Sequence, residues 1–212
     1  MEVYVDDMIT KFKNQVEHPG HLEETVELLR RYKMKLNLEK CMFGVSSGKF
    51  LGFMVSHRGI EANPEKIRAV IEIKSPRTIK DVQSLTGKLA TLNQFISRAT
   101  NKCHVFFKIM RKGKKMEWTM ECEEAFQQLK QYLLKALLLS TPREGNILYL
   151  YLVISEWATS AVIGREEAVV QCPVYYTSKA LLDAKTRYSE MEKWVLALVM
   201  VARKLRPYFQ HI

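Results

Sequence analysis

The last third of the chain carries the pattern that most constrains its fold. Residues 147–155, 161–165 and 172–178 read as three strands in succession. A long, largely apolar helix is predicted over residues 190–209. Such a helix would cover one face of a sheet, and three strands alone leave that sheet in need of further strands. The pattern therefore predicts a helix-covered, incomplete sheet.

The middle of the chain has helical periodicity. We expect a short helix that begins at Pro64, a second helix over residues 78–96 and a third over residues 119–134. Residues 108–115 are rich in lysine and arginine and are predicted to form a basic linker. An ordinary solvated linker is favoured there over a specific binding site.

The first part of the chain combines short strands with one helix. Residues 1–5 and 9–12 are predicted to pair as strands, with Asp6 and Asp7 at or beside the turn. Four elements are then expected in order: a loop at residues 18–21, a helix over 22–35, a strand-like connection over 35–44 and a β-hairpin over 50–60.

The adjacent aspartates Asp6 and Asp7 lie among apolar residues. Two neighbouring carboxylates in an apolar strand and turn cost stability unless a cation compensates them. Taken alone, the pair is compatible with a metal site and with a simple turn signal. Other motifs in the chain are needed to choose between these two interpretations.

Composition narrows the class of protein. The net charge of +10 favours an anionic partner, nucleic acid first and an anionic membrane second. The four cysteines are widely spaced and form no zinc pattern, so reduced thiols are expected. No stretch is apolar enough to span a bilayer, and the N-terminus is acidic where a signal peptide would be basic. We therefore expect a soluble, intracellular protein of the cytoplasm or nucleus.

Seven short motifs occur in a characteristic order. They are YVDD at residues 4–7, LNLEKCMF at 36–43, KFLGF at 49–53, PEKIRA at 64–69, QSLTGKL at 83–89, WT with Cys122 and AF at 118–126, and PVYYTS at 173–178. Together they resemble the reverse transcriptase and ribonuclease H region of the Pol polyprotein of a gypsy-type LTR retrotransposon, of plant type. The resemblance covers nearly the whole chain.

The resemblance implies an α+β fold that is truncated at both ends. Residues 1–56 would be the C-terminal part of the polymerase palm with its primer-grip hairpin, and residues 57–112 the helical thumb. Residues 113–212 would contain a connecting helix and the N-terminal half of an incomplete ribonuclease H-like α/β domain. The fingers and an earlier palm strand would precede Met1.

The resemblance also assigns a polymerase site. In the family, nucleotide addition is a two-metal phosphoryl transfer that uses Mg²⁺ or Mn²⁺. Asp6 and Asp7 match the catalytic, metal-binding turn. Because successive residues of an extended chain point in opposite directions, Asp6 is the better candidate for direct ligation. A third aspartate would lie upstream, so the pair supplies only part of the site.

Two segments are implied to contact nucleic acid. The hairpin would position the primer backbone, and the thumb helix would lie along a groove of an RNA–DNA or DNA primer-template duplex. A glycine in that helix suits either close approach of the duplex or helix packing. The residues assigned in this way are Lys49, Phe50, Leu51 and Gly52 in the hairpin and Gln83, Gly87 and Lys88 in the helix.

The ribonuclease H-like part departs from its family pattern. Alignment with the family places Val153 at the metal-binding aspartate of the first strand and Trp194 at the glutamate of the first helix. Glu192 lies about 200° away around that helix and is a poor substitute. Glu156, the nearest acid to the first position, cannot hold a metal pair alone. This part is therefore expected to keep the fold and to have lost the chemistry.

The sequence thus predicts a fragment of a retrotransposon RNA-directed DNA polymerase with a ribonuclease H-like domain, inactive as an isolated chain. A dNTP would bind only in the intact enzyme, and no membrane partner is expected. The alternative is a non-catalytic, basic nucleic-acid-binding remnant that recognises a primer-template duplex.

Overall fold

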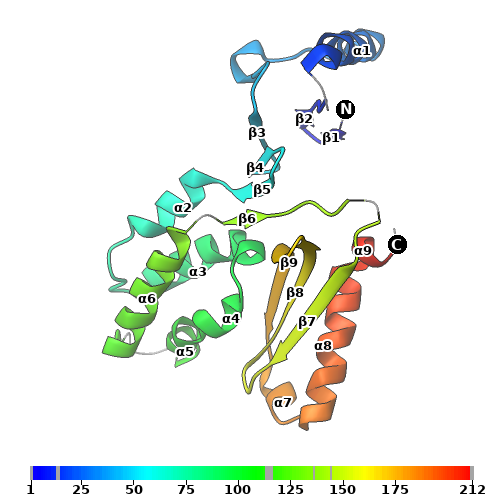
Figure 1. Ribbon diagram of the computed structural model, residues 1–212. Helices are drawn as coiled ribbons and strands as arrows, with labels where there is room; N and C mark the ends of the chain where they lie inside the picture. The colour runs from blue at the N-terminus through cyan, green and yellow to red at the C-terminus, as the bar shows by residue number, and fades with distance from the viewer. Residues whose placement is uncertain (1, 13–14, 113–116, 136, 144, 211–212) are drawn as a thin grey trace. The chain divides into compact units, whose positions relative to one another are not determined.

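A computed structural model describes residues 2–12, 15–112, 117–135, 137–143 and 145–210 (Figure 1). The chain divides into two compact units, Met1–His57 and Arg58–Ile212. Each unit is described below by itself.

Two hairpins form the strands of the first unit. Strands β1 (Glu2–Tyr4) and β2 (Asp7–Ile9) are antiparallel. Strands β3 (Ser47–Phe50) and β4 (Phe53–Ser56) form the second hairpin. The hairpin predicted over residues 50–60 is incomplete as a description, because the chain already reverses at Leu51 and Gly52, within the segment that reads as its first strand.

The turn between β3 and β4 explains that difference. Leu51 and Gly52 form a two-residue connection with φ of 51° and 75°. Positive φ at both central positions is the geometry of the tight hairpin turn that matches strand twist, and glycine adopts it without steric cost. The glycine predicted to bend a strand therefore closes a hairpin.

Helix α1 (His18–Arg31) corrects a second expectation. The His18-Pro19-Gly20-His21 segment, predicted to be a loop, is its first turn. Proline is accommodated there because the first helical N–H groups have no partner within the helix. The strand-like connection predicted over residues 35–44 contains instead a 3₁₀ turn at Leu38–Lys40, where the Asn37 side chain accepts a hydrogen bond from the Glu39 amide.

The second unit begins with a short ribbon and a group of helices. Strand β5 (Gly59–Ala62) pairs with β6 (Leu138–Leu139). The helices between them are α2 (Pro64–Ile71), α3 (Ile79–Thr91), α4 (Ala99–Lys102), α5 (His104–Lys112) and α6 (Met120–Leu133). The first part of the predicted basic linker is thus helix α5, and residues 113–116 lie outside the described residues.

Aromatic side chains form the core of this helical group. Phe106 of α5 and Phe126 of α6 are fully buried. Trp118 stacks on Phe106 at a centroid distance of 5.7 Å and meets Phe126 edge to face at 5.9 Å. Offset-stacked and edge-to-face contacts are the favoured aromatic geometries, so this cluster joins α5 to α6.

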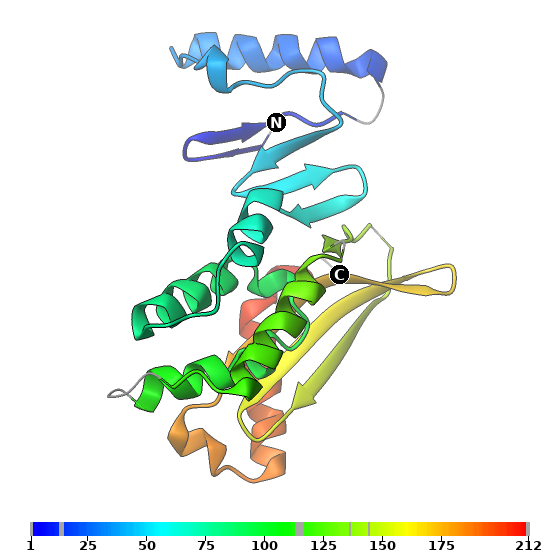
Figure 2. The ribbon, with the colours of Figure 1, turned by 90° about the vertical axis from the view of Figure 1, so that its left-hand side faces the viewer.

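The C-terminal part of the second unit is a sheet of three antiparallel strands, ordered β7-β8-β9 (Figure 2). The strands are β7 (Leu148–Ile154), β8 (Ala158–Glu167) and β9 (Val170–Ala180). They confirm the three strands predicted from the sequence. The long helix is also confirmed, but it divides at Leu205 into α8 (Glu190–Lys204) and α9 (Arg206–Gln210).

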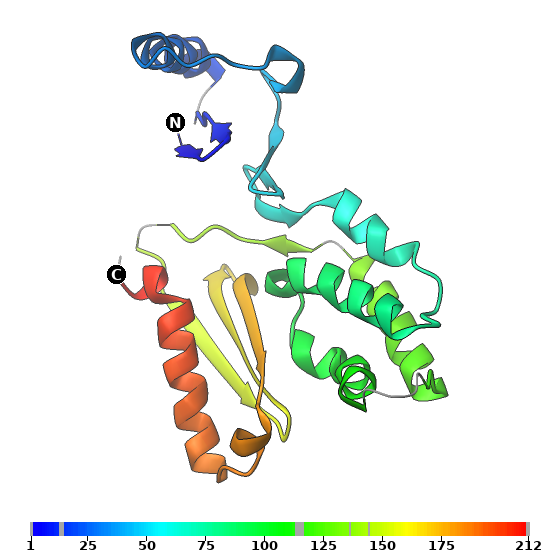
Figure 3. The ribbon, with the colours of Figure 1, turned by 180° about the vertical axis from the view of Figure 1, so that it is seen from behind.

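Helices lie on both faces of this sheet (Figure 3). Thr159 of β8 contacts Met200 of α8. The next residue, Ser160, bonds Ser178 of β9, and the Ser178 hydroxyl accepts a hydrogen bond from Thr100 N in α4. Because neighbouring residues of a strand point to opposite faces, α8 and α4 lie on opposite sides of the sheet.

Candidate nucleic-acid interface

The aspartate pair lies at the tip of the first hairpin. Tyr4 pairs with Asp7, so Val5 and Asp6 form the two-residue turn and Asp7 begins β2. Both aspartates are exposed. Val5 has a φ of 51°, a left-handed conformation that costs a β-branched residue about 1–2 kcal/mol. Strained residues of this kind cluster at functional sites, and the sequence pattern contains no sign of this one.

Asp7 ties the two hairpins of the first unit together. Its Oδ2 accepts a hydrogen bond from the backbone N–H of Leu51 at 3.0 Å. The bond joins the tip of the Asp6-Asp7 hairpin to the turn of the β3–β4 hairpin. Asp6 has no hydrogen bond or ion pair with any described residue. The two neighbouring carboxylates therefore have different environments.

The described residues around Asp6 and Asp7 form no complete metal site. A pair of divalent cations needs several carboxylates that converge on one point. Among the described residues, no group of three or more histidine, cysteine, aspartate or glutamate side chains could hold a metal ion. Asp6 and Asp7 alone therefore do not fit the complete two-metal arrangement.

We expect Asp7→Ala, but not Asp6→Ala, to expose the Leu51 amide to exchange. Loss of the carboxylate removes the acceptor of the Leu51 N–H. A hydrogen bond of about 1 kcal/mol corresponds to roughly fivefold faster exchange. Hydrogen exchange followed by NMR measures this amide directly. Equal protection of Leu51 in both variants would contradict the assigned bond.

The proposed primer-grip residues gather at one hairpin tip. Lys49 and Phe50 end β3, and Leu51 and Gly52 form the turn. Lys49 and Leu51 are exposed, whereas Phe50 is half-buried. The turn therefore presents a cationic and an apolar side chain beside the backbone amide that Asp7 holds.

Helix α3 presents a second candidate surface. Its start is fixed by a capping box between Thr78 and Asp81. Gln83 and Gly87 are exposed, and a Cβ built on Gly87 would meet nothing within 4 Å. Within the described residues, nothing packs against Gly87. Lys88 Nζ donates a hydrogen bond to the Ala69 carbonyl at 3.2 Å, so this lysine also joins α3 to α2.

The two positions predicted to depart from the ribonuclease H pattern lie in regular elements. Val153 lies in β7 opposite Ser160, and Trp194 lies on α8 with 37% of its surface exposed. Glu192 closes the N-terminal cap of α8, where it accepts hydrogen bonds from the Ser189 hydroxyl and amide, each at 2.8 Å. Both bonds lower the pKa of Glu192. This carboxylate already has a structural role, and Glu156 is exposed on the turn after β7.

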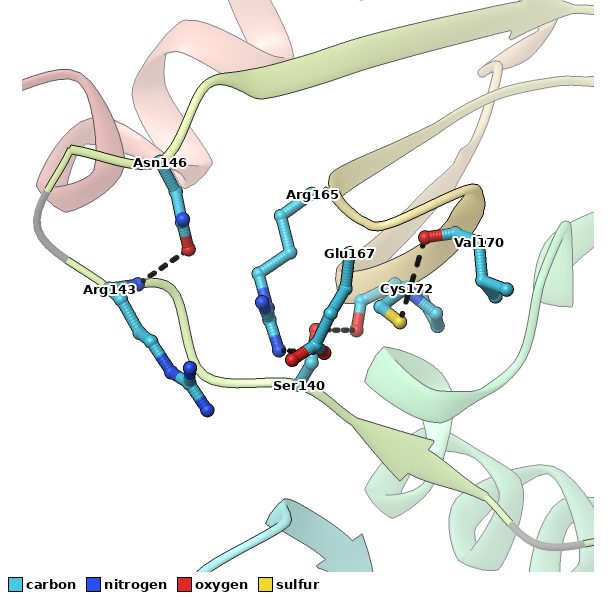
Figure 4. Close-up of polar contacts among 8 residues, drawn as sticks. Ser140, Arg143, Asn146, Arg165, Glu167, Val170 and Cys172 are labelled. Atoms are coloured by element: carbon cyan, nitrogen blue, oxygen red, sulfur yellow. Dashed lines mark hydrogen bonds and ion pairs between the residues drawn. The ribbon is translucent and has the colours of Figure 1, made fainter.

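Acidic residues at the other end of the sheet also have partners (Figure 4). Glu167 forms an ion pair of 2.7 Å with the buried side chain of Arg165. Ser140 donates a hydrogen bond from its hydroxyl to the Pro173 carbonyl at 3.0 Å, which holds the segment after β6 against β9. The Ser140 contact connects the sheet to its neighbouring loop, whereas the pair of Arg165 and Glu167 lies within β8.

Two parts of the chain match family models. Residues 1–55 match the model for reverse transcriptase (RNA-dependent DNA polymerase). Residues 118–212 match the RNase H-like domain found in reverse transcriptase. The first part of the chain is therefore similar to reverse transcriptase and the last part to an RNase H-like domain, in the order that the sequence motifs predicted.

Similar curated proteins include transposon polyproteins. The Transposon Tf2-3 and Tf2-4 polyproteins of Schizosaccharomyces pombe are each 26% identical over 208 residues, which is 98% of this chain. The chain spans 16% of the length of these relatives. These relatives come from a fission yeast, and the plant type expected from the sequence stays a prediction.

Solved structures support the fold. A foamy viral protease-reverse transcriptase in complex with RNA/DNA hybrid has a TM-score of 0.76 at 20% identity, over 92% of this chain and 26% of that chain. A related structure in complex with double-stranded DNA also has a TM-score of 0.76 at 20% identity, over 95% and 35% of the respective chains. The predicted α+β fold is confirmed. No described helix is long and apolar enough to cross a membrane.

Proposed function

We propose that the chain is part of the Pol polyprotein of a gypsy-type LTR retrotransposon and that it binds a primer-template duplex. The similarity to retrotransposon polyproteins and to reverse transcriptases solved with RNA/DNA hybrid and double-stranded DNA supports this proposal. The proposal includes plant origin and the division into a palm part at 1–56, a thumb at 57–112 and a connecting and RNase H-like part at 113–212.

The main observation in support of duplex binding is that Gly87 lies on α3 with open space at the position of a Cβ. A glycine inside a helix costs about 1 kcal/mol relative to alanine. No packing constraint accounts for that cost here, because a Cβ would meet nothing within 4 Å. Close approach of a ligand backbone would account for it. Gln83, one turn earlier, offers polar contacts on the same exposed side.

The first unit is proposed to position the primer end. The Asp7 bond to Leu51 holds the β3–β4 turn beside the aspartate hairpin, and Lys49 supplies a cation at that turn. We assign Asp7 a positioning role and Asp6 the role of direct metal ligand. Mg²⁺ or Mn²⁺ would supply charge stabilisation for phosphoryl transfer when the missing carboxylate is provided.

We further propose that this chain alone neither extends a primer nor cleaves a hybrid. The described residues supply two carboxylates at the polymerase position, and Val153 and Trp194 occupy the expected ribonuclease H ligand positions. A dNTP would be bound only with the remaining parts of the enzyme. The alternative function is that of a non-catalytic nucleic-acid-binding remnant. Such a remnant would use the same surface to bind the duplex, but it would not be part of an active polymerase.

Filter binding to a primer-template duplex over a salt series tests the duplex proposal. Three phosphate contacts would weaken binding about fortyfold between 50 and 200 mM salt, because each contact releases counterions. An RNA–DNA and a DNA duplex of equal length are compared. Absence of salt-dependent binding to both duplexes would refute the proposed function.

Primer extension tests the catalytic part of the proposal. The purified chain with Mg²⁺ or Mn²⁺ and dNTPs is expected to leave a labelled primer unextended and an RNA–DNA hybrid intact. If extension occurs and Asp6→Asn abolishes it, the inactive assignment is wrong. Hybrid cleavage would equally overturn the assignment of Val153 and Trp194 as lost ligand positions.

A further inference from the structure

A cleft beside α3 has the lining of a phosphate site. It has a volume of about 380 Å³ and lies where the loop after α2 meets α3. The loop runs along the right-hand edge of the helical group in Figure 3. The cleft is lined by Ile73, Lys74, Ser75, Arg77, Asp81 and Ser84. Two cations and two hydroxyl groups therefore converge on one concave surface.

The cations of the cleft are available to an anion. Lys74 and Arg77 are exposed and form no ion pair within the described part of the chain. The one acid in the lining is already engaged. Asp81 Oδ2 accepts hydrogen bonds from the backbone N–H groups of Arg77 at 3.0 Å and Thr78 at 2.9 Å. Those bonds lower the pKa of Asp81 and direct its charge toward the helix start.

A contact from a neighbouring helix holds the loop in place. Lys130 Nζ of α6 donates a hydrogen bond to the Ile73 carbonyl at 2.6 Å. One residue of the cleft wall is thus fixed to a helix other than α3. Such support reduces the entropy lost when a ligand binds.

One residue of the cleft wall lies beside Gly87 on α3. Ser84 lines the cleft and precedes Gly87 by three residues. Residues three apart are neighbours on a helix surface. A nucleic-acid backbone that approaches Gly87 would therefore pass Ser84 within one helical turn.

We propose that Lys74, Arg77 and Ser84 bind a backbone phosphate of the duplex that contacts α3. The inference rests on the proposed duplex binding and adds a specific phosphate subsite to it. The two cations supply charge, and the Ser84 hydroxyl supplies a directional hydrogen bond. Recognition is independent of base sequence.

The salt dependence of binding to a primer-template duplex tests the subsite. Each neutralised phosphate contributes about 0.9 to the slope of log affinity against log salt concentration. Because Lys74 and Arg77 share one phosphate, the double variant Lys74→Gln/Arg77→Gln should lower the slope by about 0.9. Its loss of affinity between 50 and 200 mM salt should be about 3.5-fold smaller than that of the wild type. Arg203→Gln/Lys204→Gln, at the end of α8, is the matched charge control.

Uncharged analogues of single backbone phosphates show which phosphate the subsite contacts. A methylphosphonate placed at successive positions of one strand should weaken wild-type binding most at one position and leave the double variant unaffected there. Ser84→Ala should weaken binding at every salt concentration without changing the slope. A Tm equal to that of the wild type verifies that each variant is folded.

The outcomes separate the subsite from duplex binding itself. If the wild type binds duplex and the double variant keeps the wild-type slope, the subsite is refuted and duplex binding stands. If the wild type does not bind duplex, both proposals fail. Competition by inorganic phosphate that equals competition by duplex would refute backbone recognition and indicate a site for free phosphate.

Discussion

Gly59→Ala is expected to lower the free energy of unfolding of the second unit by about 3 kcal/mol or more. Gly59 has a φ of 138°, a conformation that side-chain-bearing residues rarely adopt. A Cβ there would lie 2.1 Å from the Leu139 carbonyl oxygen. Because that oxygen belongs to the paired strand β6, relief requires separation of the β5–β6 ribbon.

Thermal unfolding measures this effect as a fall in Tm of roughly 6–12 °C, at about 2–4 °C per kcal/mol for a domain of this size. Gly87→Ala is the control in the same unit, since its new Cβ meets open space. A Gly59→Ala protein as stable as the wild type would contradict the close approach of the two strands.

Gly87→Ala is expected to change stability and binding in opposite directions. Replacing a solvent-facing helical glycine with alanine should raise the free energy of unfolding by about 1 kcal/mol. If a duplex backbone approaches this position, the added methyl group should weaken duplex binding by about tenfold, or 1.4 kcal/mol. Gly87→Leu should weaken it further. Filter binding and thermal unfolding of the same preparations give both quantities.

Gly20→Ala provides a matched comparison. Gly20 is also in a helix, and its Cβ would likewise meet nothing within 4 Å. Its substitution should raise stability without affecting duplex affinity. Wild-type affinity in Gly87→Ala would show that the duplex does not approach α3 closely at this residue.

Periodic patterns predicted the second unit well. The strands β7, β8 and β9 and the helices α3 and α6 follow from alternation, helical spacing and capping residues such as Thr119. Local signals misled where one residue type serves two purposes. Pro19 begins α1 although proline also marks loops, and Gly52 closes a turn although glycine also bends strands.

The candidate site was only partly predictable for a different reason. Asp6 and Asp7 are recognisable as a motif, but the bond from Leu51 to Asp7 joins residues 44 positions apart. No local pattern encodes such a contact. The open surroundings of Gly87 likewise depend on what packs around α3. Sequence spacing left close approach and helix packing equally open at that glycine, and no described residue packs against it.

The helical group lies in one long connection whose two ends are joined by the pairing of β5 with β6. The chain leaves at Ala62 and returns at Leu138, where the two strands pair. The entropy of closing such a loop grows slowly, by about 0.6 kcal/mol for each doubling of length. Insertions or deletions at exposed turns between these helices should therefore be tolerated, whereas the two strand ends that close this connection admit almost no variation in backbone spacing. The paired strands thus fix where the helical segment begins and ends, whereas the length of that segment can vary.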